Sequence, residues 1–303
     1  MFLAHFGVMA QEIPSAYQHV SSYLNKKGDF KDGVFKLSVP RTDLKVTIDG
    51  IEAPTAFGFG GWLAMTKGDK NAEVMMGDLV LLEDEVNPVM SALLENGLEV
   101  TALHNHFFWE EPRIFYMHVH GFGSAKQLAR QVKPALDLIG VKSSRHRSER
   151  GTASGTSDVS PNRGVADTMS TNALARIIGH QGERFGPVYK ITIGRPDIDL
   201  REMGARINAR MGLNTWAAFF GSDQKAAIAG DVAMLEEEVT NVLKALRKHG
   251  LDVVAIHHHM TGGRPMIIFL HYWGTGPAEQ LALGFRAALD ELGKKPARAP
   301  MTH

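Results

Sequence analysis

An internal repeat restricts the fold of this chain more than any other feature of its sequence. Residues 75–140 align without a gap on residues 228–293, and 28 of the 66 aligned positions are identical. Further upstream the match continues, with "VFKLSVPRTDL" of the first copy facing "VYKITIGRPDI" of the second. A repeat of this length predicts that the chain contains two copies of one structural unit.

The repeat divides the chain of 303 residues into two predicted units, at residues 1–141 and residues 166–303. The segment between them, residues 142–165, is rich in serine, glycine and arginine and has no apolar periodicity. This composition predicts a solvated linker or a long surface loop.

Apolar periodicity predicts the elements of each copy. In the first copy, Val86, Val89 and Leu93 recur at helical spacing, and Gly97 follows as a helix-ending residue. We expect strands near residues 34–40, 44–52, 58–66, 73–82, 98–107 and 113–121. We expect helices near residues 14–27, 84–96 and 124–139. The predicted fold class is α+β, in which each unit is a mostly antiparallel sheet with helices on one face.

The composition excludes several kinds of protein. Lysine plus arginine and aspartate plus glutamate both number 33, so the chain lacks the basic field of a nucleic-acid or membrane-surface protein. The absence of cysteine excludes disulfides, thiolate metal sites and iron–sulfur clusters. No apolar run approaches the roughly 18 residues of a membrane span. We expect no nucleic-acid partner and no membrane span; the ligand, a small molecule or an envelope component, stays unassigned.

The N-terminal segment "MFLAHFGVMAQE" has an apolar run that ends in Val8-Met9-Ala10, like the end of a signal peptide. A charged region before the run is missing, and His5 interrupts it. We expect a periplasmic or secreted location from this segment, and a cytoplasmic location stays open.

Histidines are concentrated at equivalent places in the two copies. Eight of the fourteen lie within residues 104–120 and 257–271. Residues two apart in a strand share one face of the sheet, so the histidines of each window can lie together. Three positions are histidine in both copies: His104, His106 and His118 in the first, and His257, His259 and His271 in the second.

Three imidazoles on neighbouring strands can hold a divalent metal ion, and zinc is the metal that we expect. The sequence predicts such a site in each copy, on the three histidines named above. Purely structural histidines are the alternative, because histidines on a sheet face often hydrogen-bond only to their neighbours. The fourth histidine of the first copy, His120, is replaced by Trp273 in the second.

Carboxylates near these histidines are candidates for a catalytic base or a further ligand. Asp78 sits late in a predicted strand, where helix capping does not explain it, and Asp231 occupies the equivalent place. Glu110 lies four positions beyond the HxH motif, but the second copy has glycine there. Glu83 and Glu85 open a predicted helix, so capping explains them better. Asp78 and Glu110 are therefore the predicted catalytic residues.

The segments "LKVTIDGIEAP", "GDLVLLEDEVNPVMSALLENGLEVTALHNH" and "PRIFYMHVHG" resemble the LppY/LpqO family of bacterial proteins, also catalogued as a domain of unknown function. The resemblance covers most of the first copy, and the second copy is similar to a diverged unit of the same domain. It implies an exported or lipid-anchored bacterial protein and carries no established activity.

Two functions are compatible with these patterns. The first is a divalent-metal-binding protein of the bacterial cell envelope, acting as a hydrolase through a metal-activated water. The second is a non-enzymatic module that binds a ligand or partner between the two units, with structural histidines. Histidine sets that point apart would favour the second.

Overall fold

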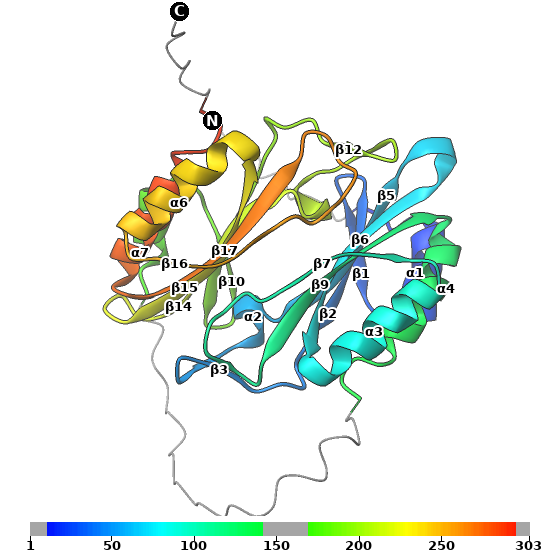
Figure 1. Cartoon of the computed structure of the whole chain (residues 1–303), viewed down its shortest axis with the longest axis horizontal. Coiled ribbons are helices and arrows are strands. Elements are labelled where there is room, and N and C mark those ends of the chain that lie inside the picture. Colours follow the sequence, from blue (N-terminus) through cyan, green and yellow to red (C-terminus); the bar gives the residue numbers. More distant parts are fainter. Residues whose placement is uncertain (1–10, 142–168, 295–303) are drawn as a thin grey trace, which may run out of the picture.

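The computed structural model describes residues 11–141 and 169–294. Two six-stranded sheets pack against each other in the middle of the molecule, and helices cover the outer face of each sheet (Figure 1). The predicted linker at residues 142–165 and residues 1–10 of the signal-like segment lie outside the described residues. The linker and the export signal therefore stay predictions.

Six strands of the first copy form one antiparallel sheet. In spatial order they are β1 (Gly28–Lys31), β2 (Val34–Pro40), β5 (Gly60–Lys67), β6 (Glu73–Leu82), β9 (Ile114–Gly123) and β7 (Glu99–His104). Alternate side chains point to opposite faces of a strand. In β2, Phe35 accordingly packs against the helices while Val34 packs against the second sheet. Since both faces of the sheet are covered, its central strand β6 is apolar along most of its length.

The second copy repeats this arrangement. In spatial order its strands are β10 (Glu183–Phe185), β11 (Val188–Gly194), β14 (Asn214–Gly221), β15 (Ala226–Leu235), β17 (Ile267–Gly276) and β16 (Asp252–His257). The strand order of the two sheets is equivalent, which confirms the internal repeat.

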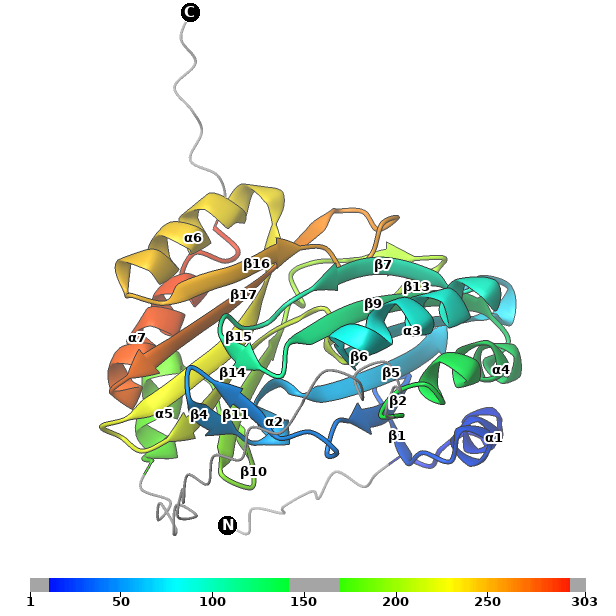
Figure 2. The ribbon, with the colours of Figure 1, turned by 60° about the horizontal axis from the view of Figure 1, so that its bottom comes forward.

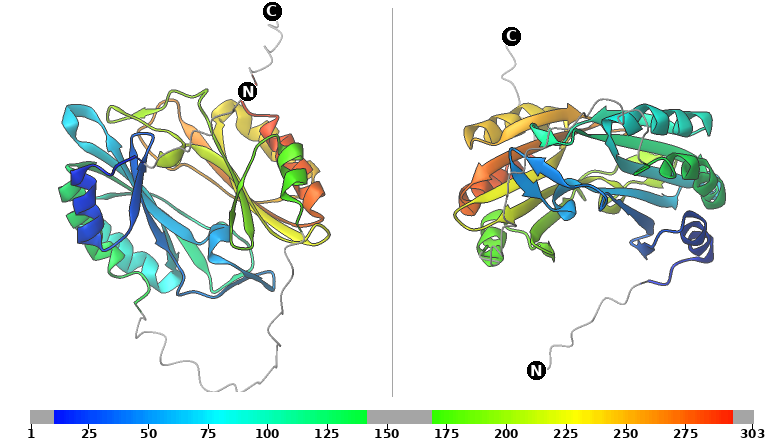
Figure 3. Two further views of the ribbon diagram at one scale, coloured as in Figure 1. Left: turned by 180° about the vertical axis from the view of Figure 1, so that it is seen from behind. Right: turned by 90° about the horizontal axis from the view of Figure 1, so that it is seen from below.

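Three helices cover the outer face of each sheet (Figure 3). They are α1 (Ser15–Leu24), α3 (Glu83–Glu95) and α4 (Ala125–Leu136) in the first copy, and α5 (Thr171–Ile178), α6 (Val239–Lys248) and α7 (Ala278–Leu289) in the second. Ser124 caps α4 by accepting a hydrogen bond from Gln127 N at 3.2 Å. Gly97 and Gly250 follow α3 and α6 with φ of 76° and 75°, which ends both helices as the sequence predicts.

Shorter elements complete the fold: β3 (Val46–Ile48), β4 (Ile51–Ala53) and β8 (Glu110–Glu111) in a small sheet, α2 (Thr55–Gly58), the pair β12 (Arg201–Glu202) and β13 (Ala205–Arg206), and 3-10 helices at Asp69–Asn71, Ala209–Met211 and Glu236–Glu238. The sequence predicts neither β1, α2 nor β8. The architecture confirms the predicted α+β class with mostly antiparallel sheets. Within the described residues, no helix has the length and apolar character needed to cross a bilayer.

The inner faces of the two sheets share a buried interface. Apolar side chains of both copies, such as Val34 and Phe269, belong to one cluster between the sheets. The edge strands β7 and β16 approach each other (Figure 2). Between the two copies, Thr101 Oγ1 donates to His259 O at 2.6 Å. Side chains on the inner face of one sheet therefore face the other copy.

A buried ion pair holds each copy together at the same place. Arg41 lies 2.5 Å from Glu85, and Arg195 lies 2.8 Å from Glu238, with all four side chains buried. Glu85 also accepts a hydrogen bond from Leu82 N at 2.8 Å, closing the first turn of α3. The capping interpretation of Glu85 is thus confirmed.

Candidate metal centre

The inner faces of both sheets carry the histidines that the sequence singles out. His104 ends β7 and lies opposite Tyr116 of β9, two residues before His118. The same register recurs in the second copy, where His257 lies opposite Phe269. The histidines of one copy are therefore diagonal neighbours across two strands, close enough for their rings to interact.

Imidazole rings of the two copies form three close pairs, of which the first two named here are stacked and the third is tilted by 31°. Their ring centroids are separated by 3.7 Å in the pair His104–His257, by 3.6 Å in His106–His271 and by 3.9 Å in His118–His259. His104 and His257 are equivalent residues, so the approximate two-fold axis of the repeat passes between them. The six histidines form one cluster, which belongs to neither copy alone.

Nitrogen atoms converge most closely across the two copies. His104 Nε2 lies 3.1 Å from His271 Nε2 and 3.2 Å from His106 Nε2. Among the described residues, three groups have potential ligand atoms within 4.8 Å of one another: His104, His106 and His271; His104, His118 and His257; and Asp231, His257 and His271. Neither three-histidine set that the sequence predicts within one copy forms such a group.

Backbone carbonyls orient two of the rings. His271 Nδ1 lies 3.2 Å from Gly230 O, and His118 hydrogen-bonds to the backbone of Gly77 in the equivalent place. A ring that donates from Nδ1 to a carbonyl keeps its lone pair on Nε2. The Nε2 lone pairs of these two histidines are thereby available within the cluster.

Burial keeps the cluster uncharged. It lowers the pKa of His257 to about 4, and it holds the pKa of the other five well below the ordinary value: His104, His106, His118, His259 and His271. Repulsion among the rings, if they were protonated, adds to this effect. At neutral pH the imidazoles are therefore neutral, which is the form that binds metal ions.

Several ring nitrogens of the cluster are buried without a hydrogen-bond partner: His104 Nδ1, His106 Nδ1, His118 Nε2, His257 Nε2 and His259 Nδ1. A buried polar atom without a partner costs roughly 1–3 kcal/mol. An ion or ordered water bound at these atoms would relieve this cost.

A cavity of about 830 Å³ adjoins the cluster between the two sheets, and His106, His259 and His271 form part of its wall. Its volume lies within the range of roughly 300–1,000 Å³ that is typical of small-molecule sites. The cluster therefore borders a space that a substrate or ligand can occupy.

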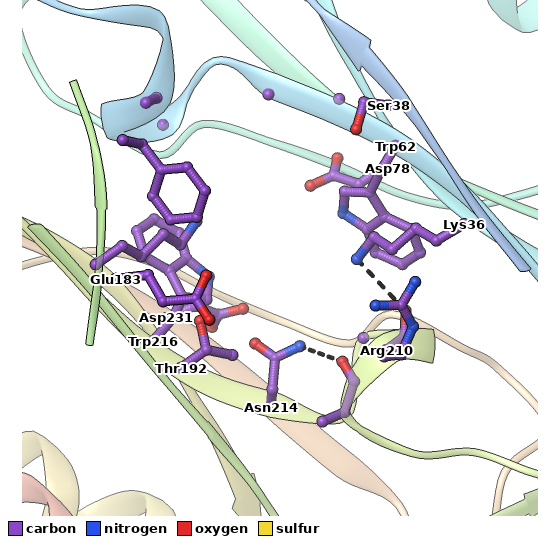
Figure 4. Close-up of a pocket in the computed structure, with 18 of the residues that line it drawn as sticks. Lys36, Ser38, Trp62, Asp78, Glu183, Thr192, Arg210, Asn214, Trp216 and Asp231 are labelled. Atoms are coloured by element: carbon purple, nitrogen blue, oxygen red, sulfur yellow. Dashed lines mark hydrogen bonds between the residues drawn. The ribbon is translucent and has the colours of Figure 1, made fainter. Parts of the chain in front are cut away.

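Equivalent acids and tryptophans line opposite sides of this cavity. Trp62 and Asp78 lie on one side, and Trp216 and Asp231 lie on the other (Figure 4). Burial raises the pKa of Asp78 to about 8 and that of Asp231 well above its usual range. Asp231 Oδ1 accepts a hydrogen bond from Leu270 N at 3.2 Å, whereas Asp78 Oδ1 is buried without a partner.

Two lysines that the sequence analysis did not single out also line the cavity. Lys36 Nζ lies 4.1 Å from the ring centroid of Trp62, and Lys190 Nζ lies 4.1 Å from that of Trp216. Burial lowers the pKa of each lysine to about 8. The repeat could have indicated these residues, because in its alignment Lys36 matches Lys190 and Trp62 matches Trp216.

The predicted catalytic residues lie in different places. Neither belongs to the three groups of potential ligands, but Asp78 lines the cavity and Glu110 does not. Glu110 lies in β8, where Ile114 N donates to its carboxylate at 3.4 Å and Arg113 Nε lies 3.6 Å away. Asp78 is therefore the better placed of the two for chemistry in the cavity.

The additional histidine of the first copy has a separate partner. His120 Nδ1 lies 3.4 Å from Glu202 Oε1 of β12, and both side chains are buried. Burial and the nearby Glu99 raise the pKa of Glu202 to about 7. This pair joins the two copies, but it is not among the groups that could hold a metal.

The fold and the site define a duplicated α+β protein in which both copies share one histidine cluster and one cavity. The chain belongs to the family described as Domain of Unknown Function (DUF1259), whose model matches residues 18–138 and 172–291. This match corrects the assignment to the LppY/LpqO family, which none of the comparisons indicates. The tandem matches agree with the internal repeat and assign no activity.

No curated protein matches the chain. Two solved structures are similar to it at low scores. One is a trimeric bacterial microcompartment shell protein, PduB, with 12% identity, a TM-score of 0.21, and coverage of 90% of this chain and 96% of that chain. The other is EtuB from Clostridium kluyveri, with 9% identity, a TM-score of 0.19, and coverage of 86% and 89%. Similarity at this level supports no conclusion on fold or function.

Proposed function

We propose that the chain is a metal-dependent hydrolase that holds one divalent ion, zinc by preference, on His104, His106 and His271. The observation that carries this proposal is the separation of their Nε2 atoms, 3.1 Å and 3.2 Å from His104. A tetrahedral zinc ion with bonds of about 2.0–2.1 Å to nitrogen holds its ligand atoms roughly 3.3 Å apart. The spacing of the three nitrogens fits such an ion.

The surroundings of these histidines also support a metal site. Burial keeps all three imidazoles neutral, so no proton has to leave before an ion binds. The contact of His271 Nδ1 with Gly230 O is the kind of outer hydrogen bond that orients metal-binding histidines.

The ring planes determine what must move when an ion binds. His106 and His271 are stacked, with an angle of 26° between their planes. The lone pair of a ring nitrogen lies in the plane of its ring, so two stacked rings cannot both aim at one ion. Rotation of His106 about its Cβ–Cγ bond would remove this conflict and keep the contact of His271 with Gly230 O.

The catalytic step follows from the position of the cavity. A bound zinc ion would lower the pKa of a coordinated water to about 7 and so supply a nucleophile at neutral pH. Asp78 is the proposed general base, because its side chain faces the cavity and its pKa of about 8 is near the working pH. Asp231 belongs to a group with His257 and His271 and is the alternative base.

A binding module without catalysis is the second candidate. The stacking of His104 on His257 and the close contact of His118 with His259 favour it, since these rings already pack well without an ion. The cavity would then hold a ligand that the protein does not change.

The metal content of the full chain tests the proposal. Protein purified without an affinity tag or chelator, and then incubated with zinc, should contain about one equivalent by mass spectrometry. The double variant His104→Ala/His106→Ala should contain almost none. His258→Ala is the matched control, because this neighbouring histidine belongs to none of the three groups and should leave the content unchanged.

Circular dichroism shows whether the double variant is folded. If it is not, cobalt-substituted wild-type protein should still show the visible absorption of a tetrahedral site. Equal metal content in the wild type and in a folded double variant would contradict the histidine assignment. Wild-type protein that binds neither zinc, iron, copper nor manganese would leave the binding module as the function.

A further inference from the structure

We infer that the cavity binds a small organic anion, whose carboxylate or phosphate group sits between the ammonium groups of Lys36 and Lys190. The cavity of about 830 Å³ has room for such a molecule, and both lysines line it. This inference extends the proposed function. Only the identification of the anion as the substrate rests on that function; binding of the anion does not.

The two lysines are held in the same way in both copies. Each ammonium lies over the ring of a tryptophan of its own sheet, Trp62 or Trp216, at 4.1 Å. This contact fixes the position of a side chain that is otherwise flexible. Equivalent cations from the two copies therefore line one cavity, and Figure 4 shows Lys36 beside Trp62.

Few protein groups hydrogen-bond to the ammonium groups of Lys36 and Lys190 in the described parts of the chain. Lys36 Nζ donates to Arg210 O at 3.4 Å, and neither lysine lies within ion-pair distance of a carboxylate in the described parts of the chain. An ammonium group has three hydrogens to donate. Arg210, in contrast, is paired with Asp29 at 2.5 Å. Both lysines therefore keep free donors, and Arg210 Nε is also buried without a hydrogen-bond partner.

The other charged groups of the cavity do not cancel this positive charge. Asp78 and Asp231 face it and attract the ammonium groups, but burial raises both pKa values and so disfavours their charged forms. Glu183 and Lys31 also line it and have opposite charges. Lys36 and Lys190 repel each other, and that repulsion contributes to the lowered pKa of Lys36. An anion between them would relieve it.

The position of the anion relative to the histidines defines the substrate class. His106 and His271, two of the three proposed metal ligands, form part of the wall of the same cavity. An anion held by the lysines would place the rest of its molecule toward these rings. The proposed substrate is therefore an ester or amide that also carries a carboxylate or phosphate group.

Titration calorimetry on the full chain tests the anion site. Metal is first removed with a chelator, which is then removed as well, so that the result does not depend on the metal site. Inorganic phosphate and benzoate are titrated separately at pH 7 and constant ionic strength. We expect one saturable site for at least one of them, and the stronger probe tells phosphate from carboxylate.

Variants of the lysines identify the site. Lys36→Met/Lys190→Met should weaken binding at least tenfold, because it removes both ammonium groups as donors of charge-assisted hydrogen bonds. Lys36→Arg/Lys190→Arg retains both charges and should keep most of the affinity. Lys31→Met removes a charge from the same cavity and is the matched control, with less than a threefold effect.

Two results would overturn the inference. One is the absence of saturable binding for both probes, and the other is a loss in Lys31→Met as large as in the double methionine variant. The zinc content of the wild-type protein, measured beside its anion binding, separates this inference from the proposed function. Normal zinc content without anion binding would reject the anion site alone, and anion binding without zinc would reject the metal site alone.

Discussion

The two copies of the repeat have matching histidines in the shared cluster but differ in the residues beside them. Tyr116 and His120 of the first copy are replaced by Phe269 and Trp273 in the second. Tyr116 donates a hydrogen bond to Gly58 O at 3.0 Å, which a phenylalanine cannot do. Residues beside the cluster have thus diverged, while residues that build the fold, such as the two buried arginines, have stayed the same.

The positions of the nitrogen atoms show the same asymmetry. His104, His106 and His271 form a group within 4.8 Å, but the set that the repeat relates to them, His257, His259 and His118, does not among the described residues. A duplication can give two equal sites or one site to which both copies contribute. The geometry of this cluster corresponds to the second outcome.

The largest effect is expected where the two copies are alike. Arg41→Ala and Arg195→Ala each leave a buried glutamate without its cation, so each should lower the free energy of unfolding by about 3–5 kcal/mol. Urea unfolding followed by circular dichroism measures this change. Lys133→Ala is the control, because its pair with Asp137 is on the surface and should contribute less than about 1 kcal/mol. A large loss for only one arginine would break the equivalence of the copies.

A second comparison uses the equivalent residues His104 and His257. His104→Ala removes a proposed ligand and should weaken zinc binding by at least about 100-fold. Even the loss of a hydrogen bond to a metal ligand can weaken metal binding by about 100-fold. His257→Ala should retain most of the affinity, because His257 lies outside the proposed ligand set. Competition with a chromophoric chelator measures both affinities. Equal losses of zinc affinity in the two variants would instead assign the ion to the group His104, His118 and His257.

A smaller effect is expected from Glu202, which contacts His120 of the other copy. Its pKa is raised to about 7 by burial and by Glu99. The folded state therefore holds this proton more tightly than the unfolded state, and the stability that it provides is lost as the pH rises from about 4.5 through about 7. Glu202→Gln should remove this loss, which amounts to roughly 1–3 kcal/mol. Unfolding of the wild type and of Glu202→Gln at several pH values measures this loss. If the free energy of unfolding depended on pH in the same way in both proteins, a raised pKa of Glu202 would be contradicted.

The sequence predicted most of the fold because its signals are local. Strands β2 and β6 occur where alternation and apolar runs placed them, and Gly97 ends α3 as expected. The repeat extends these predictions to the second copy. The elements β1 and β8 are too short for periodicity to show, so they were missed.

The site could be predicted only in part, because its geometry depends on how the copies pack. Alignment shows that His104 and His257 are equivalent, but it cannot show that their rings stack on each other. The sequence therefore grouped the histidines within each copy. Lys36 and Trp62 were missed since each looks like an ordinary residue of an alternating strand, and only the inner face of the second sheet encloses them in a cavity.

The axis between His104 and His257 has a consequence for the history of the chain. A single unit of this fold would carry only half of the cluster and one wall of the cavity. It could complete both only by forming a two-fold symmetric homodimer, in which each residue meets its own counterpart. Fusion of two such units into one chain removes the requirement for that symmetry, so mutations can then improve one half of the ancestral interface without changing the other.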